Sequence, residues 1–182
     1  FHEHYPDVSV RLIEQGDELL LKALQSNDAD IIIGGMPVST QDVTVTLALE
    51  QLLLIVPRAF NIIPSWAYTG NSYENPYEID PKQLQGLPLI LPSTVNDIGG
   101  ITNQVLEHFD IRPKFVTTVD SMQTAAMLVA QDMGYLFTSP IFLKAQMAEL
   151  APNIVYCMAR GIPDSRKIVA VYHSDTYKEE MI

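Results

Sequence analysis

The sequence predicts an α/β protein of two Rossmann-like lobes, with mixed, mainly parallel sheets and an interlobe cleft. Three observations lead to this prediction. Apolar runs rich in β-branched residues, typical of buried strands, recur along the 182 residues. Stretches with helical periodicity separate these runs, which is the pattern of a sheet covered by helices. A stretch rich in Pro, Asn, Tyr and Gly, residues 58–82, divides the chain into two such segments.

The first strand is expected at residues 8–15, where apolar and polar residues alternate. Ahead of it, Phe1 and Tyr5 lie one helical turn apart, and Pro6 ends that turn. The chain therefore begins inside a helix without an initiator Met. We expect it to be a piece of a longer protein.

A helix is expected over residues 18–25, with Gly16 or Asp17 as its cap and leucines as its apolar stripe. Asn27 suits the left-handed residue that ends such a helix. The run ADIIIGG at residues 29–35 follows as a strand buried on both faces. Strand, helix and strand in this order predict a parallel β-α-β unit.

Two further strands are expected within residues 43–57. Their short separation indicates either an antiparallel pair or a strand that leaves one sheet for another. Residues 58–82 are predicted to form a long loop with at most a helical turn. The aromatic residues of this loop either pack on their lobe, which the cost of exposing them favours, or close over the cleft. These residues are Trp66, Tyr68, Tyr73 and Tyr77.

A second alternation of strands and helices follows the loop. Strands are expected at residues 84–92, 112–119, 134–140, 153–159 and 166–173, and helices at residues 99–110, 122–131 and 141–150. Ser121 is placed to cap the second of these helices. The first segment is short of strands for a closed core, so the last strands are expected to return to it. The expected subdomains are residues 1–57 with 158–182, and residues 58–157.

The charge balance argues against nucleic-acid binding by this segment. Its 11 basic and 22 acidic residues give a formal net charge of -11, which repels phosphate backbones. The longest apolar stretch, LALEQLLLIVP, is too short and too interrupted to span a bilayer. The single cysteine, Cys157, lies in an apolar run and is expected to be an inert buried thiol. One cysteine and no signal peptide fit a cytoplasmic protein.

His2, Glu3 and His4 raise the question of a metal site at the start of the chain. In a strand the two imidazoles would share a face, whereas in a helix residues two apart point in different directions. Since the helical turn is better supported, no metal site is predicted, and no cofactor is expected. The sequence also contains no G-x-S-x-G, G-x-G-x-x-G, P-loop or CxxC motif, and His108 and His173 occur singly. No enzyme is predicted.

Six segments together resemble the effector-binding domain of a LysR-type transcriptional regulator. They contain YPDVSVRLIEQG, ALQSNDADIIIG, EQLLLIVP, LQGLPLIL, VDSMQTAAMLVAQDMGYLFTSP and RKIVAVY, and they span nearly the whole chain. The resemblance implies the two-lobed fold of type 2 periplasmic binding proteins, with the first strand missing because it would precede Phe1. It also implies a small-molecule effector in the cleft, and homodimers of this domain that form tetramers at full length. DNA would bind through a winged helix-turn-helix that is absent from this chain.

The candidate effector-binding residues follow three of the predicted strands. In parallel α/β sheets, ligands lie beyond the carboxyl ends of strands, where helix N-termini offer free N–H groups. The residues at these positions are Gly34, Gly35 and Met36, then Ser93, Thr94 and Val95, and finally Thr138 and Ser139. The resemblance implies effector contacts at matching positions. A positive helix terminus favours an organic anion as the effector.

Each group also has a purely structural explanation. Ser93 and Thr94 could serve only as helix caps, the glycines only as a turn, and Ser139 only as turn chemistry. Asp132 stands where the resemblance leads us to expect Gly. Because Asp tolerates left-handed backbone better than most residues, the fold should survive this departure.

Two other functions remain open at the level of sequence. One is an extracytoplasmic solute-binding protein of a transporter, which a hydrophobic leader in the full reading frame would indicate. The other is a two-lobed enzyme of the same architecture, such as a dehydratase or deaminase, which a turnover assay would reveal. An upstream helix-turn-helix would indicate the regulator instead.

Overall fold

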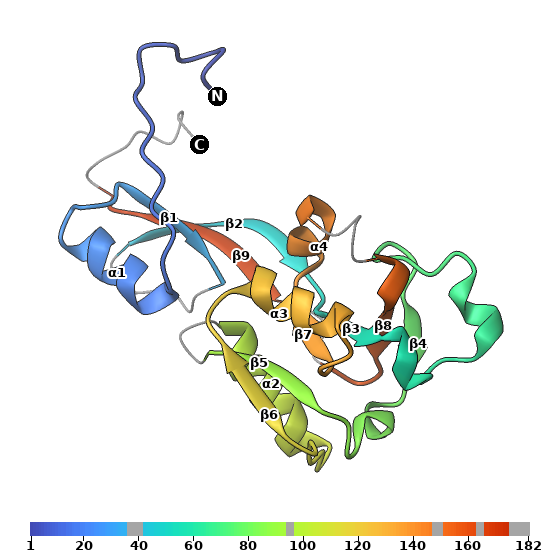
Figure 1. The fold of residues 1–182 in the computed structure, drawn as a ribbon. Coiled ribbons are helices and arrows are strands. Elements are labelled where there is room, and N and C mark those ends of the chain that lie inside the picture. The colour runs from blue at the N-terminus through green and yellow to red at the C-terminus, as the bar shows by residue number, and fades with distance from the viewer. Residues whose placement is uncertain (36–41, 94–96, 147–150, 163–165, 175–182) are drawn as a thin grey trace.

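The chain folds into two lobes that lie side by side (Figure 1). The computed structural model describes residues 1–35, 42–93, 97–146, 151–162 and 166–174. It combines helices with mixed sheets, as the sequence predicts. Antiparallel pairings are nevertheless more frequent than parallel ones among the described strands. The reason is that strands β9 and β3, each central in its sheet, run opposite to both of their neighbours.

The first lobe is a three-stranded sheet with a helix on one face. Its strands are, in spatial order, β1 (Ile31–Gly34), β9 (Arg166–Tyr172) and β2 (Val43–Glu50). Helix α1 (Asp17–Gln25) covers one face, where Leu24 joins Ile32, Val169 and Val171 in a small apolar core. The last strand of the chain thus returns to the first lobe, as its shortage of strands suggested.

The prediction of a strand at residues 8–15 is wrong. The segment has no regular structure, and the side chain of Leu12 is 91% exposed. A strand exists only through hydrogen bonds to a neighbour, and β1 pairs with β9 alone among the described strands. Arg11 ties the segment to the lobe instead, donating from Nη2 to the carbonyl oxygen of Asp28 at 2.9 Å. The parallel β-α-β unit is therefore not formed by these residues.

Several local predictions are confirmed. Residues 1–5 form a helical turn with a 2.9 Å backbone hydrogen bond, although its aromatic rings are exposed and contact no core. Asn27 and Asp132 have φ values of 59° and 60°, the left-handed conformation expected of them. Ser121 caps its helix by accepting a hydrogen bond from the Thr124 N–H at 3.3 Å. These features depend on neighbours in the sequence, so a sequence pattern is enough to predict them.

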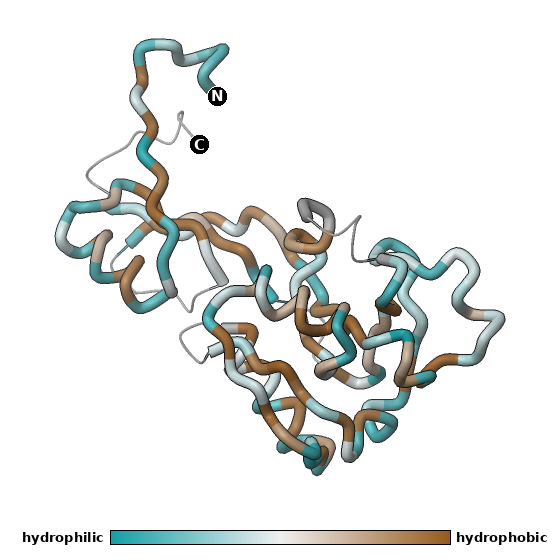
Figure 2. Tube along the Cα trace, viewed as in Figure 1, coloured by the Kyte–Doolittle hydropathy of each residue, from teal (hydrophilic) through white to brown (hydrophobic). Residues whose placement is uncertain are grey.

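The second lobe contains two sheets connected by one bridge. The larger sheet has the order β4 (Tyr77–Ile79), β8 (Ile154–Ala159), β3 (Leu53–Pro57) and β7 (Leu136–Thr138), and the smaller one pairs β5 (Leu89–Pro92) with β6 (Val116–Val119). A parallel bridge between Leu89 and Tyr135 joins the two. Figure 2 shows that hydrophobic residues predominate in the strands at the centre of this lobe. Every residue of β3 is buried.

Helices cover both faces of the larger sheet. The remaining elements are α2 (Asp97–His108), α3 (Met122–Ala130), α4 (Pro140–Gln146) and the short 3₁₀ helices η1 (Arg58–Phe60), η2 (Ser65–Tyr68), η3 (Pro81–Leu84) and η4 (Ala151–Asn153). Side chains alternate along a strand, so Leu53 and Ile55 belong to the core under α3, while Leu54 and Val56 belong to the core under α2. This burial on two faces explains why β3 reads as a continuous apolar run.

The stretch predicted as one long loop contains more structure than its composition suggested. Residues 58–82 hold β4 and three 3₁₀ helices. Strand β4 could not be predicted from the sequence, because β4 has only three residues and pairs with β8, far along the chain. Tyr73 meets Tyr156 edge-on, with ring centroids 6.5 Å apart. Trp66 is 72% exposed and meets Tyr77 edge-on at 5.9 Å. The described aromatic contacts of the loop are thus within its own lobe.

The chain crosses between the lobes twice. Strands β2 and β3 lie in different sheets, which confirms one of the two alternatives for residues 43–57. The chain returns between Ala159, at the end of β8, and Arg166, at the start of β9. From these pairings we propose that the first limit between the subdomains lies at residues 51–52 and the second after Ala159, in place of limits at residues 57 and 158.

Candidate functional site

Three strands of the second lobe end along one edge. Strand β5 runs parallel to β6, with Pro92 paired to Val119. On its other side, the Ile90 N–H donates to the carbonyl oxygen of Tyr135, next to β7, at 2.9 Å. The carboxyl ends of β5, β6 and β7 therefore meet, and such an edge is where open α/β sheets bind ligands. Ser93 lies half-buried at this edge.

Helix α2 begins directly beside this edge. A Cβ atom on Gly99, in the first turn of the helix, would lie 2.5 Å from the carbonyl oxygen of Pro92 and 3.0 Å from that of Ser93. Glycine at this position therefore lets the helix N-terminus approach the strand end. Two other predicted contact residues of this stretch, Thr94 and Val95, lie outside the described residues.

Gly34 and Gly35 lie at one end of the first-lobe sheet. The chain crosses to the second lobe from this same end. Gly34 is paired with Val169 of β9, close to Arg166, where that strand begins. Figure 1 shows β1 running toward the second lobe. Gly34 and Gly35 are half-buried. Met36 lies outside the described residues.

Thr138 ends β7 and Ser139 follows it directly, and both are buried. The Thr138 hydroxyl has no hydrogen-bond partner among the described residues, and the residue is 0% exposed. The Ser139 hydroxyl donates to Glu50 Oε2 at 2.7 Å and accepts from the Ile141 N–H at 3.2 Å. Ser139 therefore caps α4, which starts at Pro140. Its only hydroxyl proton is already used inside the protein.

Sequence reasoning missed the ion pair beside these residues. Glu50, at the end of β2, stands opposite Arg166 in the register of β9, and Arg166 Nη1 donates to Glu50 Oε1. Their side chains are 5% and 13% exposed. The available signal was a single charge within the apolar run LALEQLLLIV, because a buried carboxylate requires a cation or hydrogen-bond donors.

The structure divides the described candidate residues into two groups. Ser93, Thr138 and Ser139 share the carboxyl edge of the second lobe, whereas Gly34 and Gly35 lie at the adjoining end of the first sheet. The hydrogen bond between Ser139 and Glu50 connects the two lobes beside the first group. The arrangement can offer a ligand the N-terminus of α2, the Ser93 hydroxyl and glycine backbone.

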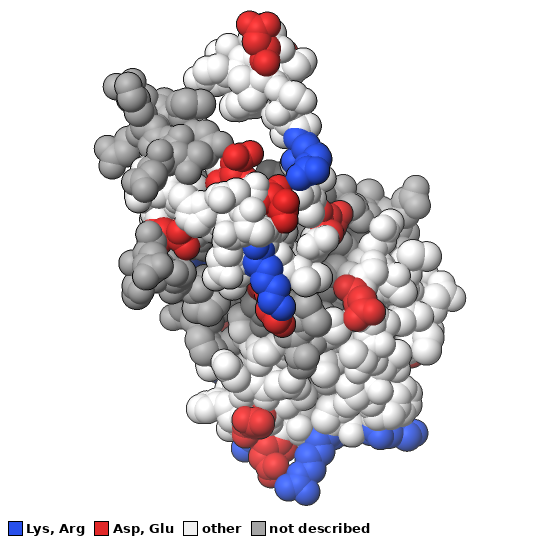
Figure 3. Space-filling view, turned by 90° about the vertical axis from the view of Figure 1, so that its left-hand side faces the viewer, with Lys and Arg blue, Asp and Glu red and all other residues white. Residues whose placement is uncertain are grey.

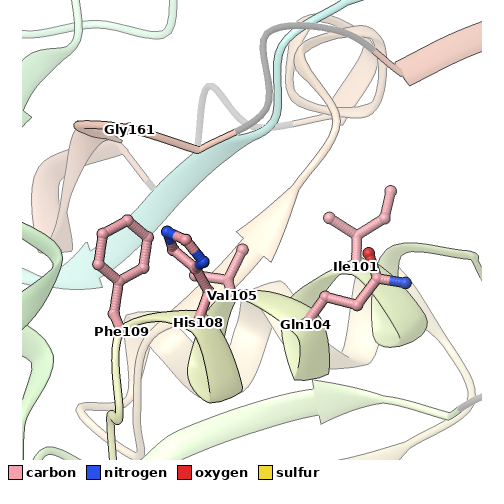
Figure 4. Close-up of a pocket in the computed structure, with 6 residues that line it drawn as sticks. All are labelled: Ile101, Gln104, Val105, His108, Phe109 and Gly161. Atoms are coloured by element: carbon pink, nitrogen blue, oxygen red, sulfur yellow. The ribbon is translucent and has the colours of Figure 1, made fainter.

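A separate hollow lies along α2 (Figure 4). It has a volume of about 280 Å³ and is lined by Ile101, Gln104, Val105, His108, Phe109 and Gly161. The His108 ring meets the Phe109 ring edge-on at 4.7 Å. None of the predicted effector-binding residues lines this hollow, so it is distinct from the strand-end site.

His173 is hydrogen-bonded within the first lobe, and Cys157 is inert. The His173 ring donates from Nε2 to the carbonyl oxygen of Leu24 at 2.8 Å, and its Nδ1 lies 2.7 Å from Asp42 Oδ1. The ring thereby links the end of α1 to the sheet. Burial raises the pKa of the Cys157 thiol to about 12, so the thiol is protonated at neutral pH. Cys157 is therefore the inert buried thiol that its apolar surroundings predicted.

Acidic groups dominate the charge of the chain. Figure 3 shows Asp and Glu side chains spread over one face of the molecule, with Lys and Arg gathered mainly toward its lower end. Within the described ranges, no three His, Cys, Asp or Glu side chains come together as metal ligands. The described helices are also all too short or too polar to cross a membrane.

Comparison with known proteins identifies the family of this chain. A model of the family described as the LysR substrate binding domain matches residues 1–182, which is the whole chain. Curated protein sequences yield no match.

Solved structures share the fold at low sequence identity. A cysteine mutant of Corynebacterium glutamicum OxyR has a TM-score of 0.75 at 18% identity, over 98% of this chain and 52% of that one. The regulatory domain of Synechocystis CcmR, in complex with 2-PG, has a TM-score of 0.77 at 16% identity, over 97% and 79%. The BenM effector binding domain with its effector benzoate has a TM-score of 0.72 at 16% identity, over 95% and 73%. The chain thus spans about half the length of the OxyR chain, and the predicted fold class is confirmed.

Proposed function

This chain belongs to the LysR substrate binding domain family, and we propose that it senses a small-molecule effector for a bacterial LysR-type transcriptional regulator. The observation that carries this proposal is the family match over the whole chain. The meeting of strand ends beside the crossings supports it, because that is where an α/β protein of two lobes can enclose a ligand. Solved relatives of the same fold were obtained with 2-PG, shikimate and benzoate.

The proposed site lies between the two groups of strand ends. Its residues are Gly34, Gly35, Met36, Ser93, Thr94, Val95, Thr138 and Ser139, as the sequence suggested. Among the described ones, Ser93 and the two glycines are accessible enough to contact a ligand directly. Thr138 is fully buried, so a ligand would reach its unpartnered hydroxyl only after a local rearrangement.

We propose a small organic anion as the effector. The N-terminus of α2 supports an anion near Ser93, since the helix dipole favours negative charge there. The opposite end of the site is less suited to one. The Ser139 hydroxyl already donates to Glu50, so it has no further proton to offer an anion. The anionic group is therefore expected beside Ser93, with the uncharged body of the effector toward Ser139.

The wider roles belong to the full-length protein. We propose that DNA binds through a winged helix-turn-helix encoded upstream, that this domain forms homodimers and the full protein tetramers, and that the protein is cytoplasmic and catalyses no reaction. The acidic surface of this domain supports the first point, because it disfavours direct contact with DNA. An upstream hydrophobic leader in place of a helix-turn-helix would indicate the solute-binding alternative.

Thermal melting against small carboxylates, amino acids and aromatic acids tests the effector site. A ligand at ~100 times its dissociation constant adds about 2.7 kcal/mol to the free energy of unfolding, which raises the midpoint by about a few degrees. Ser93→Ala should abolish that rise. Ser65→Ala is the matched control, since Ser65 is exposed at the start of η2.

The two variants separate the possible outcomes. A rise that Ser65→Ala keeps and Ser93→Ala loses supports the site. A rise that both variants keep places the ligand elsewhere, such as in the hollow along α2. If no carboxylate in the panel raises the midpoint, the proposal of an organic anion is wrong.

A further inference from the structure

Three side chains from three elements meet where the chain passes between the lobes. Glu50 ends β2, Arg166 begins β9 and Ser139 caps α4. One carboxylate oxygen of Glu50 accepts from Arg166, which belongs to the same sheet, and the other accepts from Ser139 of the second lobe at 2.7 Å. The hydrogen bond to Ser139 therefore connects the lobes, while the ion pair fixes the carboxylate within the first lobe.

Burial makes this hydrogen bond costly to lose. Glu50 and Ser139 are 7% and 6% exposed, so water cannot readily replace either partner. Hydrogen bonds to an ionised acceptor are stronger than those between neutral groups. Ser139 is also held on its own side, because its oxygen accepts from Ile141 in the first turn of α4. A rotation of one lobe against the other must therefore stretch this contact.

The contact lies at the two crossings between the lobes, where it can influence their relative orientation. Glu50 directly precedes the crossing to β3, and Arg166 directly follows the return from β8. Hinge motions are absorbed by a few residues at the ends of elements, which is the location of both. We propose that Glu50 is a positioning residue whose hydrogen bond to Ser139 sets the orientation of the lobes in the ligand-free domain.

The same bond regulates the effector site, a consequence that rests on the proposed function. Ser139 has one hydroxyl proton, which it donates to Glu50 Oε2. A ligand that accepts a hydrogen bond from Ser139 must replace Glu50 as the acceptor, and this releases the lobes. A ligand that donates to Ser139 leaves the contact in place. The orientation of the lobes thus depends on which hydrogen-bonding group a ligand presents at this position.

Distance measurement between spin labels on the two lobes tests the proposal without any ligand. Labels are attached to Gln25→Cys in α1 and Glu107→Cys in α2, both exposed helical positions, and the buried Cys157 stays unlabelled. Double electron–electron resonance then gives the distance distribution. Ser139→Ala should broaden or shift this distribution, and Ser139→Thr, which keeps the hydroxyl, should restore it.

Thr102→Val is the matched control. The Thr102 hydroxyl is equally buried and donates at 2.7 Å to the Ile98 carbonyl oxygen, but within α2. Its loss should lower the melting midpoint and leave the distance distribution unchanged. If Ser139→Ala does not fold, Ser139→Gly gives the readout, because glycine is nearly as good as serine at a helix cap.

Two results would overturn the proposal. One is an unchanged distribution in a folded Ser139 variant that lacks the hydroxyl. The other is a distribution that Thr102→Val broadens as much as Ser139→Ala does, since the effect would then reflect general loosening. Because no ligand is present, a failure of the effector proposal leaves this test unaffected, and the reverse holds for the melting panel.

Discussion

Glu50 and Arg166 stand opposite each other at the last described pair of the β2–β9 ladder and form a buried ion pair. Neither residue is in a lobe core, since both lie where the sheet of the first lobe ends. The carboxylate also accepts the Ser139 hydroxyl, so each of its oxygens has a partner. Such a group is tolerated inside a protein only while its partners remain in place.

Removal of the cation from this pair should be costly. Arg166→Met leaves the Glu50 charge buried without its cation, and we expect a loss of about 3–5 kcal/mol in the free energy of unfolding. The double variant with Glu50→Gln should recover a large part of it, because no charge then remains buried. Urea unfolding at neutral pH measures both. If the loss of free energy in the double variant equals the sum of the losses in the two single variants, the buried charge is not the reason for the cost.

The two adjacent glycines of α2 should respond in opposite ways. Gly100→Ala should stabilise the protein by about 0.5–1 kcal/mol, since no atom of the described residues lies within 4 Å of the added methyl group and alanine is the better helix former. Gly99→Ala should destabilise it, because the methyl group would lie 2.5 Å from the Pro92 carbonyl oxygen. Thermal melting of the pair is the measurement. Equal effects would mean that α2 is not held against the end of β5.

Stability should fall at alkaline pH in part because of Cys157. The folded protein retains the thiol proton up to its pKa of about 12, whereas the unfolded chain loses it from about 8.5. Between these values the unfolded state binds fewer protons, so the free energy of unfolding decreases as the pH rises, by up to about 1.4 kcal/mol per pH unit. Below about pH 8.5 the contribution of the thiol to the free energy of unfolding is fully retained.

Cys157→Ala isolates this contribution. Between about pH 8.5 and 10, the wild type should lose about 1–2 kcal/mol more than the variant does. Burial also raises the pKa of Tyr135, which adds a decrease of the same sign at higher pH in both proteins. Chemical unfolding at several pH values gives the two curves. Parallel curves would mean that the thiol titrates alike in the folded and unfolded states.

The aromatic loop of residues 58–82 should contribute little through its exposed tryptophan. Trp66→Ala should change the free energy of unfolding by less than about 0.5 kcal/mol, because the ring is 72% exposed. Leu54→Ala, in the fully buried β3, should cost about 2–5 kcal/mol. Urea unfolding compares the two variants. It is followed by circular dichroism, because Trp66→Ala removes the one Trp of the chain and with it the tryptophan fluorescence. A large loss from Trp66→Ala would indicate that the ring is packed in solution.

Predictions that depended on near neighbours succeeded except at residues 29–35, where burial of the strand on both faces is wrong because Ile31 and Ile33 are 42% and 59% exposed. The left-handed residues Asn27 and Asp132, the Ser121 cap and the apolar run of β3 are confirmed because propensity, capping and two-sided burial act within a few residues. Predictions that required a distant partner did not. Residues 8–15 have the alternation of a strand, but no described strand lies beside them to accept and donate hydrogen bonds.

The candidate site shows the same division. Its strand ends could be found from sequence, because strands, glycines and helix starts follow one another locally. The hydrogen bond from Ser139 to Glu50 could not be predicted, because the two residues are 89 positions apart in the sequence. Arg166 is 116 positions from Glu50. No local pattern indicates which distant charge a buried hydroxyl will meet.

Sequence alone is sufficient to predict the α/β class, the two lobes, the family resemblance and the positions of most helices and strands, because hydrophobic periodicity and turn chemistry are local properties of the chain. The tertiary structure was needed to learn which described strands pair, that β9 returns to the first lobe, and that Glu50 joins the lobes through Ser139. Those features depend on which surfaces meet once the core is buried, and hydrogen bonds between residues far apart in sequence then select one arrangement.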